Sequence, residues 1–319
     1  MLTAASLTAA SLTAASLTVA SLSRRQLETR LAGPGLAVRT GPFASRIRST
    51  IPQVADGIEL LYGAYPLLGD EDFADFHVGL RRPGGLHRWY KPQVSFDLDG
   101  LVPFEPLPEA HAFPMLEWGL NWCISTRAHA YLMIHAAVVE RDGLAAILPA
   151  PPGSGKSTLC AALVHRGWRL LSDELALLRP QDGLLLPVPR PVSLKNRSID
   201  VIRAYVADAV LSAPVSNTTK GTVAHLKAPA ASVARAGESA RPAWIVFPKY
   251  EAGAATSLET IPRARAFFRV ADNAFNYSHM GASGFATLAG AIDACTSYDF
   301  RYSDLDEAMA VFAALEAPQ

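Results

Sequence analysis

The stretch Leu144–Thr158, LAAILPAPPGSGKST, decides the expected fold. Its first six residues are apolar and predict a strand, while Ser157–Arg166 predicts a helix that ends at Gly167. The loop between them resembles the phosphate-binding pattern GxxxxGK[ST], with a match at Gly155-Lys156-Ser157 but Ala150 in place of the first glycine. Because a strand before this loop and a helix after it are the context that the pattern requires, the stretch predicts nucleotide binding.

The residue types in the loop suit a bound phosphate chain. Gly153 and Gly155 have no Cβ, so the backbone can adopt positive φ and its amide groups can approach phosphate oxygens closely. We expect Lys156 to contact the β- and γ-phosphates and the Ser157 hydroxyl to bind Mg²⁺, at the positive end of the helix. The expected cofactors are therefore ATP and Mg²⁺. The predicted nucleotide contacts are Pro152, Gly153, Ser154, Gly155, Lys156, Ser157 and Thr158. The alternative is a chance Gly/Pro turn with an exposed lysine, which the flanking elements disfavour.

Two acidic residues, Asp173-Glu174, follow the strand predicted at Trp168–Leu171. In open α/β sheets ligands bind at the carboxyl ends of strands, so both carboxylates are expected to face the γ-phosphate. Phosphoryl transfer needs a metal ligand and a group that accepts the hydroxyl proton, and two adjacent acids can divide these tasks. The alternative is a solvated acidic turn.

Two lysines are weaker candidates for contacts to phosphate or substrate. Lys195 and Lys220 each lie in a short polar segment, where a positive charge could stabilise the transferring phosphoryl group. A solvated loop lysine is the ordinary alternative for both.

These motifs resemble the bacterial HPr kinase/phosphorylase family, and most closely its relatives called HPr-kinase-related kinases of group A. The resembling segments are His135–Val138, Leu144–Pro149, Pro152–Ser157 and Gly167–Glu174, with looser similarity at Pro191–Asn196 and Tyr302–Ala308. The resemblance implies an α/β fold: a P-loop kinase domain of the HPr kinase or phosphoenolpyruvate-carboxykinase-like type, preceded by a smaller β-rich domain.

The resemblance also implies a role for each acidic residue and for one histidine. Asp173 would be the general base on a substrate serine, and His135 would position it, which makes these two the expected catalytic residues. Glu174, an aspartate in true HPr kinases, would join Ser157 in binding Mg²⁺. A glycine-rich segment that accompanies phosphorylase activity in the family has no counterpart here, so neither HPr as the substrate nor the reverse reaction is predicted.

Composition divides the chain into a short repeat and two larger parts. Residues 1–24 contain four units of a five-residue repeat, LTAAS or LTVAS, whose period matches neither a helix nor a strand. Arg24-Arg25 follow this repeat rather than precede it, which disfavours a signal peptide. We therefore expect a low-complexity, disordered extension. Residues 25–130 are expected to form a β-rich region without a recognisable catalytic constellation, and residues 131–319 the P-loop catalytic domain.

Apolar periodicity and turn residues predict further elements. In the β-rich region the predicted elements are strands at Phe76–Arg82, Leu86–Tyr90 and Gln93–Leu98 and one helix at Phe113–Cys123. In the later part they are strands at His135–Glu140, Trp244–Phe247 and Tyr298–Tyr302 and helices at Ile199–Ala209 and Ser283–Cys295. A last helix is predicted over Asp304–Leu315, with Ser303 as its N-cap.

The overall composition is typical of a globular enzyme. Of 319 residues 50% are hydrophobic and 18% charged, and the net charge is zero, which gives no indication of a nucleic-acid partner. The sequence contains no apolar run of about eighteen residues, so no membrane-spanning helix is predicted. The three cysteines, Cys123, Cys160 and Cys295, are far apart and predict reduced core thiols in a cytoplasmic protein. A homo-oligomer is a further possibility that the sequence leaves open.

The leading hypothesis is an ATP-dependent kinase that transfers the γ-phosphoryl group to a hydroxyl. The acceptor would be a serine of a peptide or protein, or alternatively a small molecule. Two rival hypotheses remain open: a nucleotide-gated binding module and an NTP hydrolase, neither of which needs a docked hydroxyl next to Asp173.

Overall fold

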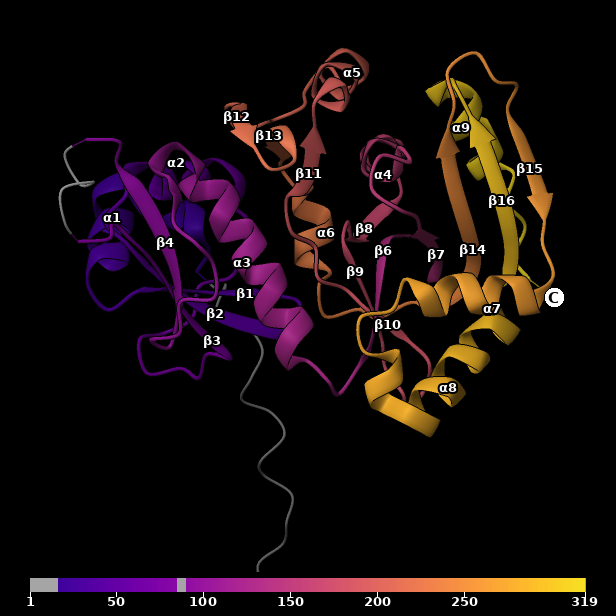
Figure 1. The fold of residues 1–319 in the computed structure, drawn as a ribbon, viewed down its shortest axis with the longest axis horizontal. Coiled ribbons are helices and arrows are strands. Elements are labelled where there is room, and N and C mark those ends of the chain that lie inside the picture. The colour runs from indigo at the N-terminus through magenta and orange to yellow at the C-terminus, as the bar shows by residue number, and fades with distance from the viewer. Residues whose placement is uncertain (1–16, 85–89, 319) are drawn as a thin grey trace, which may run out of the picture.

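The computed structural model describes residues 17–84 and 90–318, and within them the chain is a mixed α/β protein with three sheets (Figure 1). Residues 1–16 and most of the strand predicted at Leu86–Tyr90 lie outside the described residues. No helix in the described ranges is long and apolar enough to cross a membrane.

The first sheet belongs to the N-terminal region and has the strand order β1-β2-β3-β4-β5. Its strands are β1 Leu36–Thr40, β2 Phe43–Ser49, β3 Phe76–Arg81, β4 Gln93–Leu98 and β5 Leu107–Pro108. The described part of this region also holds three α-helices, α1 Arg24–Ala32, α2 Pro52–Leu61 and α3 Ala112–Arg127. The prediction of a single helix is therefore wrong. Two start signals went unrecognised: a capping box between Ser23 and Gln26 begins α1, and Pro52 begins α2.

The end of the repeat is part of this folded region. Val19, in the short 3-10 helix Val19–Ser21, is buried at 3% exposure, and its amide donates to the Tyr65 carbonyl at 3.1 Å. The expectation of disorder through residue 24 is therefore wrong for residues 17–24. The physical reason is that the fourth repeat unit carries valine where the other three carry alanine, which supplies an apolar side chain to the core.

The largest sheet has the strand order β10-β9-β6-β7-β14-β16-β15, and β8 also pairs with β6. The strands are β6 Leu132–Arg141, β7 Leu144–Pro149, β8 Arg169–Ser172, β9 Leu175–Leu178, β10 Leu185–Leu186, β14 Arg241–Tyr250, β15 Ser257–Thr260 and β16 Thr296–Tyr302. β7 is parallel to β14, and β6 is antiparallel to β7, β8 and β9. The predicted order of strand, helix and strand is present, with β6 lying between β7 and β8.

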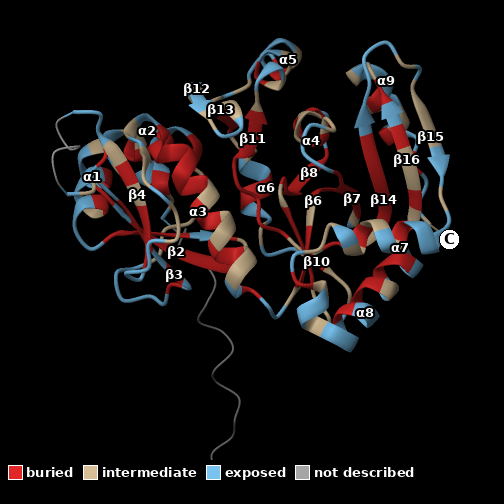
Figure 2. Ribbon diagram, viewed as in Figure 1, coloured by how far each residue is buried: buried red, intermediate tan, exposed pale blue. Residues whose placement is uncertain are grey.

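Helices cover both faces of this sheet, and Figure 2 shows its inner strand β14 largely buried, whereas the edge strand β15 is intermediate to exposed. The helices are α4 Lys156–Val164, α7 Arg263–Asp272, α8 Tyr277–Ala294 and α9 Leu305–Ala313. Successive residues of a strand point to opposite faces, and β6 shows this clearly. Val139 joins the apolar cluster that includes Leu163 of α4, while Val138 joins the cluster that includes Ile292 of α8.

A small third sheet, with the order β11-β13-β12, connects the two larger parts. Its strands are β11 Val192–Lys195, β12 Val215–Thr218 and β13 Gly221–Leu226, and the helices α5 Arg197–Tyr205 and α6 Ala230–Ala234 lie in the same part of the chain. The apolar cluster that contains α4 continues without a break through β11 and α3 into the N-terminal region.

Most predicted elements later in the chain are present with shifted ends, and the strands at Gln93–Leu98 and Leu144–Pro149 have the predicted bounds. The predicted N-cap of α9 is wrong. Asp304 caps this helix by accepting from the amides of Asp306 and Glu307, whereas the Ser303 hydroxyl donates to the Ala254 carbonyl at 2.8 Å. The three cysteines are free and buried, as predicted.

Candidate active site

The loop after β7 has the backbone conformation that its glycines were expected to provide. Gly153 and Gly155 have φ of 86° and 87°, and Gly155 is the residue that precedes α4. The Tyr302 hydroxyl donates to the Gly155 carbonyl at 3.0 Å, and the Tyr250 amide donates to the Ser154 carbonyl at 2.8 Å. A Cβ at Gly155 would lie 2.5 Å from the Tyr302 hydroxyl, so close packing as well as positive φ requires glycine there.

Lys156 is buried at the first position of α4. Its Nζ lies 3.1 Å from Nε2 of His135 on β6. Burial, together with the charge of Lys156, lowers the pKa of His135 to about 4, so the imidazole is neutral near pH 7 and Nε2 can accept from the ammonium. Burial also lowers the pKa of Lys156, against the opposing effect of Asp173.

The register of the sheet places the loop and the acidic pair beside the same part of β6. Ala136 of β6 pairs with Pro149, the last residue of β7, and the preceding residue His135 pairs on the other edge with Leu175, the first residue of β9. Asp173-Glu174 occupies the short irregular segment between β8 and β9, and both of these strands pair with β6. The acidic pair and the glycine-rich loop therefore flank one strand.

Asp173 is almost fully buried, at 5% exposure. Its Oδ2 accepts from the Ser193 amide at 3.1 Å, whereas Oδ1 has no hydrogen-bond partner among the described residues. Burial raises the pKa of Asp173 to about 6, and the charge of Glu174 adds to this rise, whereas the charge of Lys156, the nearby Ser157 hydroxyl and the Ser193 amide oppose it. A carboxylate with this pKa and a free oxygen is suited to accept a proton near neutral pH.

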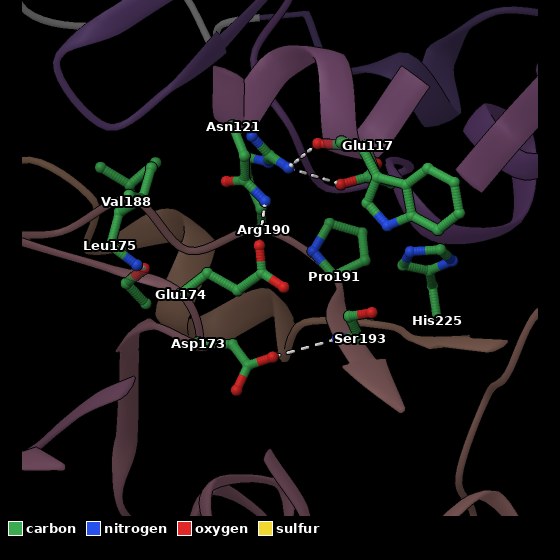
Figure 3. A pocket seen from close by; sticks show the side chains of 12 residues that line it. Glu117, Asn121, Asp173, Glu174, Leu175, Val188, Arg190, Pro191, Ser193 and His225 are labelled. Carbon is green, nitrogen blue, oxygen red and sulfur yellow. Dashed lines mark hydrogen bonds and ion pairs between the residues drawn. The ribbon is translucent and has the colours of Figure 1, made fainter. Parts of the chain in front are cut away.

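Glu174 points away from Asp173 toward helix α3 (Figure 3), where its carboxylate accepts a hydrogen bond from the side-chain amide of Asn121. Burial by itself raises the pKa of Glu174, but the charges of nearby Lys220 and Lys195, followed by Lys156, lower it below its usual value. Glu174 is therefore ionised near pH 7, in a predominantly basic environment.

The pocket beside the acidic pair contains residues that the sequence analysis did not single out. It lies between α3, the β8–β9 segment and the small sheet (Figure 3), and its polar lining includes Trp118, Asn121, Asp173, Glu174, Arg190 and His225. Arg190 Nη2 donates to the Glu117 carboxylate at 2.9 Å and to its backbone carbonyl at 2.8 Å. One signal was available: Glu117 and Asn121 are polar residues four apart in the otherwise apolar stretch 112–124 of this helix, so they share a face.

The predicted site residues are thus brought together to different extents. Asp173, Glu174 and Lys195 are close enough to Lys156 to act on its pKa. Lys220 lowers the pKa of Glu174, and its Nζ lies 5.3 Å from the centre of the Trp118 ring. His135 contacts Lys156, and no hydrogen bond joins it to Asp173 within the described chain. Pro152 at the loop tip is exposed, and Ser157 and Thr158 are half-buried.

The residues at the start of α4 and in the acidic pair fit a magnesium ion. Mg²⁺ prefers oxygen ligands, is commonly held by one or two carboxylates together with substrate phosphates, and keeps several waters. Ser157, half-buried in the first turn of α4, and the ionised Glu174 offer such oxygens. No cluster of three or more histidine, cysteine or acidic ligands occurs in the described ranges.

No protein-family model matches this sequence, and none of the curated proteins compared with it matches. Among solved structures, the chain is similar to the HPr(Ser) kinase/phosphatase from Coxiella burnetii, with 12% sequence identity and a TM-score of 0.26 over 57% of this chain and 91% of that chain. At this score the likeness does not decide the chemistry, which depends on the residues of the site.

Proposed function

We propose that this protein is an ATP-dependent phosphotransferase that moves the γ-phosphoryl group to a hydroxyl. Two features support the nucleotide half: a glycine-rich loop with positive φ at Gly153 and Gly155, and a buried lysine at the start of the following helix. The acidic pair across β6 supports the acceptor half. The catalytic part comprises residues 131–319 in this proposal, and α3 of the preceding region adds Asn121.

Each residue has a defined task in the proposed reaction. The loop amides and Lys156 bind the β- and γ-phosphates, while Ser157 and Glu174 hold Mg²⁺, which supplies charge neutralisation on the phosphates. Asp173 Oδ1 accepts the proton of the acceptor hydroxyl. A bond forms between the hydroxyl oxygen and the γ-phosphorus, the bond to the bridging oxygen breaks, and ADP leaves with that electron pair. His135 acts on Lys156 by holding its ammonium in place.

The single observation that carries the proposal is the state of Asp173. Nearly all buried polar atoms in proteins have partners, so a buried carboxylate oxygen without one needs an explanation. With the pKa raised to about 6, this oxygen is a base that is free to bind a hydroxyl donor beside the phosphate loop.

Replacement of the loop lysine tests the nucleotide half of the proposal. Lys156→Ala removes a charged hydrogen bond to the phosphates and should weaken ATP–Mg²⁺ binding by about 1.5–3 kcal/mol. Isothermal titration measures this, and Lys91→Ala, at an exposed position outside the site, is the matched control. If the folded Lys156→Ala variant binds ATP as tightly as the wild type does, the assignment of this loop as a phosphate-binding loop is contradicted.

A further inference from the structure

The pocket beside Asp173 concentrates buried polar atoms that have no partner. Five of the residues that line it carry such atoms within the described chain: Trp118, Asp173, Arg190, Ser193 and His225. Arg190, Ser193 and His225 are exposed by 6%, 6% and 1%, so bulk solvent does not satisfy them. Other partnerless buried atoms, such as those of Gln53 and Ser297, occur outside this pocket.

Most of these atoms are hydrogen-bond donors. Arg190 retains free Nε and Nη1 groups after pairing with Glu117, and the indole nitrogen of Trp118 can donate but not accept. Burial lowers the pKa of His225, so its neutral ring offers one donor and one acceptor. The Ser193 hydroxyl can do either. A complementary ligand therefore presents several acceptor oxygens to the pocket.

Asp173 Oδ1 has the opposite requirement. A carboxylate oxygen accepts hydrogen bonds, so the ligand must present a donor to it. A molecule that carries a hydroxyl at one end and a cluster of acceptor oxygens nearby satisfies both sets of atoms. Arg190 lines the pocket, and Lys195 and Lys220 act on Glu174, which also lines it; these positive charges favour an anion as the oxygen-rich group.

The burial of the pocket limits the size of what reaches the base. Asp173 and Ser193 are exposed by 5% and 6%, and α3 covers the acidic pair through the hydrogen bond from Asn121 to Glu174. A serine on the surface of a folded protein projects only a short side chain and cannot enter such a space without displacing α3. A compact free molecule needs a narrower opening than the surface of a folded protein does.

We propose that the phosphoryl acceptor is a small hydroxylated molecule with a carboxylate or phosphate group, bound between α3, β11 and β13 with its hydroxyl on Asp173. Arg190, Trp118 and His225 donate to its anionic group. This inference rests on the proposed phosphotransferase function. The γ-phosphoryl group is transferred to the hydroxyl oxygen as described above, and the proton passes to Asp173.

Transfer from γ-labelled ATP to a matched set of compounds tests the inference. The set is glycerol, glycerate, glycerol 3-phosphate and a serine peptide with both ends capped. We expect transfer to glycerate or glycerol 3-phosphate at least tenfold faster than to glycerol or the peptide, and the preferred anion identifies the group. Preference for the peptide or for glycerol, or no response of labelled-ATP turnover to either anion, would overturn the inference.

Two variants link the acceptor to this pocket. Ser193→Ala and Trp118→Phe each remove one donor and should raise KM for the anionic acceptor roughly three- to tenfold, with KM for ATP unchanged. Ser297→Ala is the matched control, because it also removes a buried, partnerless hydroxyl but lies on β16, outside the pocket. Unchanged acceptor KM in both folded variants would contradict the assignment.

Failure of the phosphotransferase function and failure of the anionic acceptor give different results. If Lys156→Ala leaves ATP affinity at the wild-type level, the phosphotransferase proposal itself fails. If ATP binds and is hydrolysed in a Lys156-dependent manner but neither anion accepts phosphate, only the acceptor inference fails.

Discussion

At the scale of single residues, the environment of each charged group determines what it can do. Lys156 lies against the neutral imidazole of His135 and does not pair with any carboxylate among the described residues, so its ammonium stays available to a ligand phosphate. Burial raises the pKa of Asp173, whereas surrounding lysines lower the pKa of its sequence neighbour Glu174. Adjacent acids with pKa values moved in opposite directions can act as a proton acceptor and a metal ligand.

The raised pKa of Asp173 predicts a specific dependence of stability on pH. The folded state binds this proton more tightly than the unfolded chain does, so ionisation costs stability as pH rises from about 4 through about 6. Asp173→Asn should therefore increase the free energy of unfolding by about 1–3 kcal/mol near pH 7.5, and the gain should vanish near pH 4. Urea unfolding at both pH values measures this.

Asp182→Asn is the control for this experiment. Asp182 is exposed and hydrogen-bonded to Arg179, which lowers its pKa, so its replacement should give no gain in stability near pH 7.5. A stability of Asp173→Asn equal to that of wild type at both pH values would show that Asp173 is not destabilised by burial.

At the scale of elements, β6 organises the site because it pairs with β7 on one edge and with both β8 and β9 on the other. Local patterns predicted most of these strands, since alternation and turn residues are local features. The same patterns failed where the decisive contact is distant. Val19 looked like one residue of a repeat, but its burial depends on Tyr65 and the rest of the N-terminal core.

The role of Val19 can be measured directly. Val19→Ala makes the fourth repeat unit identical to the first three and removes a buried side chain, so it should lower the free energy of unfolding by about 1–3 kcal/mol. Leu17→Ala in the same unit is the control, because Leu17 is 67% exposed and its truncation should change stability little. If Val19→Ala leaves the free energy of unfolding in urea unchanged, the fourth repeat unit is an extension that does not stabilise the fold.

At the scale of the whole molecule, the candidate site joins segments that are far apart in the chain. The loop, Lys156 and the acidic pair were predicted because their spacing is local and their chemistry is specific. Asn121, Arg190 and His225 were not, because each becomes part of the pocket only when α3 packs against the small sheet. The boundary expected near residue 130 stays a prediction, and the apolar core continues across it.

Helix α3 shows how the N-terminal region contributes to the candidate site. Glu117 and Asn121 of α3 bind Arg190 and Glu174, so this helix supplies one wall of the pocket and orients one member of the acidic pair. The sequence showed no catalytic constellation in this region, and the contribution is instead a positioning one, made through tertiary contacts.

The central claim is that Asp173 is the base of an ATP-dependent phosphoryl transfer, and the most direct test compares ATP binding with turnover in Asp173→Asn. The substitution keeps the side-chain shape, so ATP–Mg²⁺ affinity should remain near the wild-type value while transfer, or hydrolysis by water where no acceptor is present, falls roughly 10²–10⁴-fold. Wild-type turnover should rise with pH through about 6 and then level off, because the ionised carboxylate is the active form. Turnover by Asp173→Asn equal to that of the wild type, with ATP bound by both, would contradict the account.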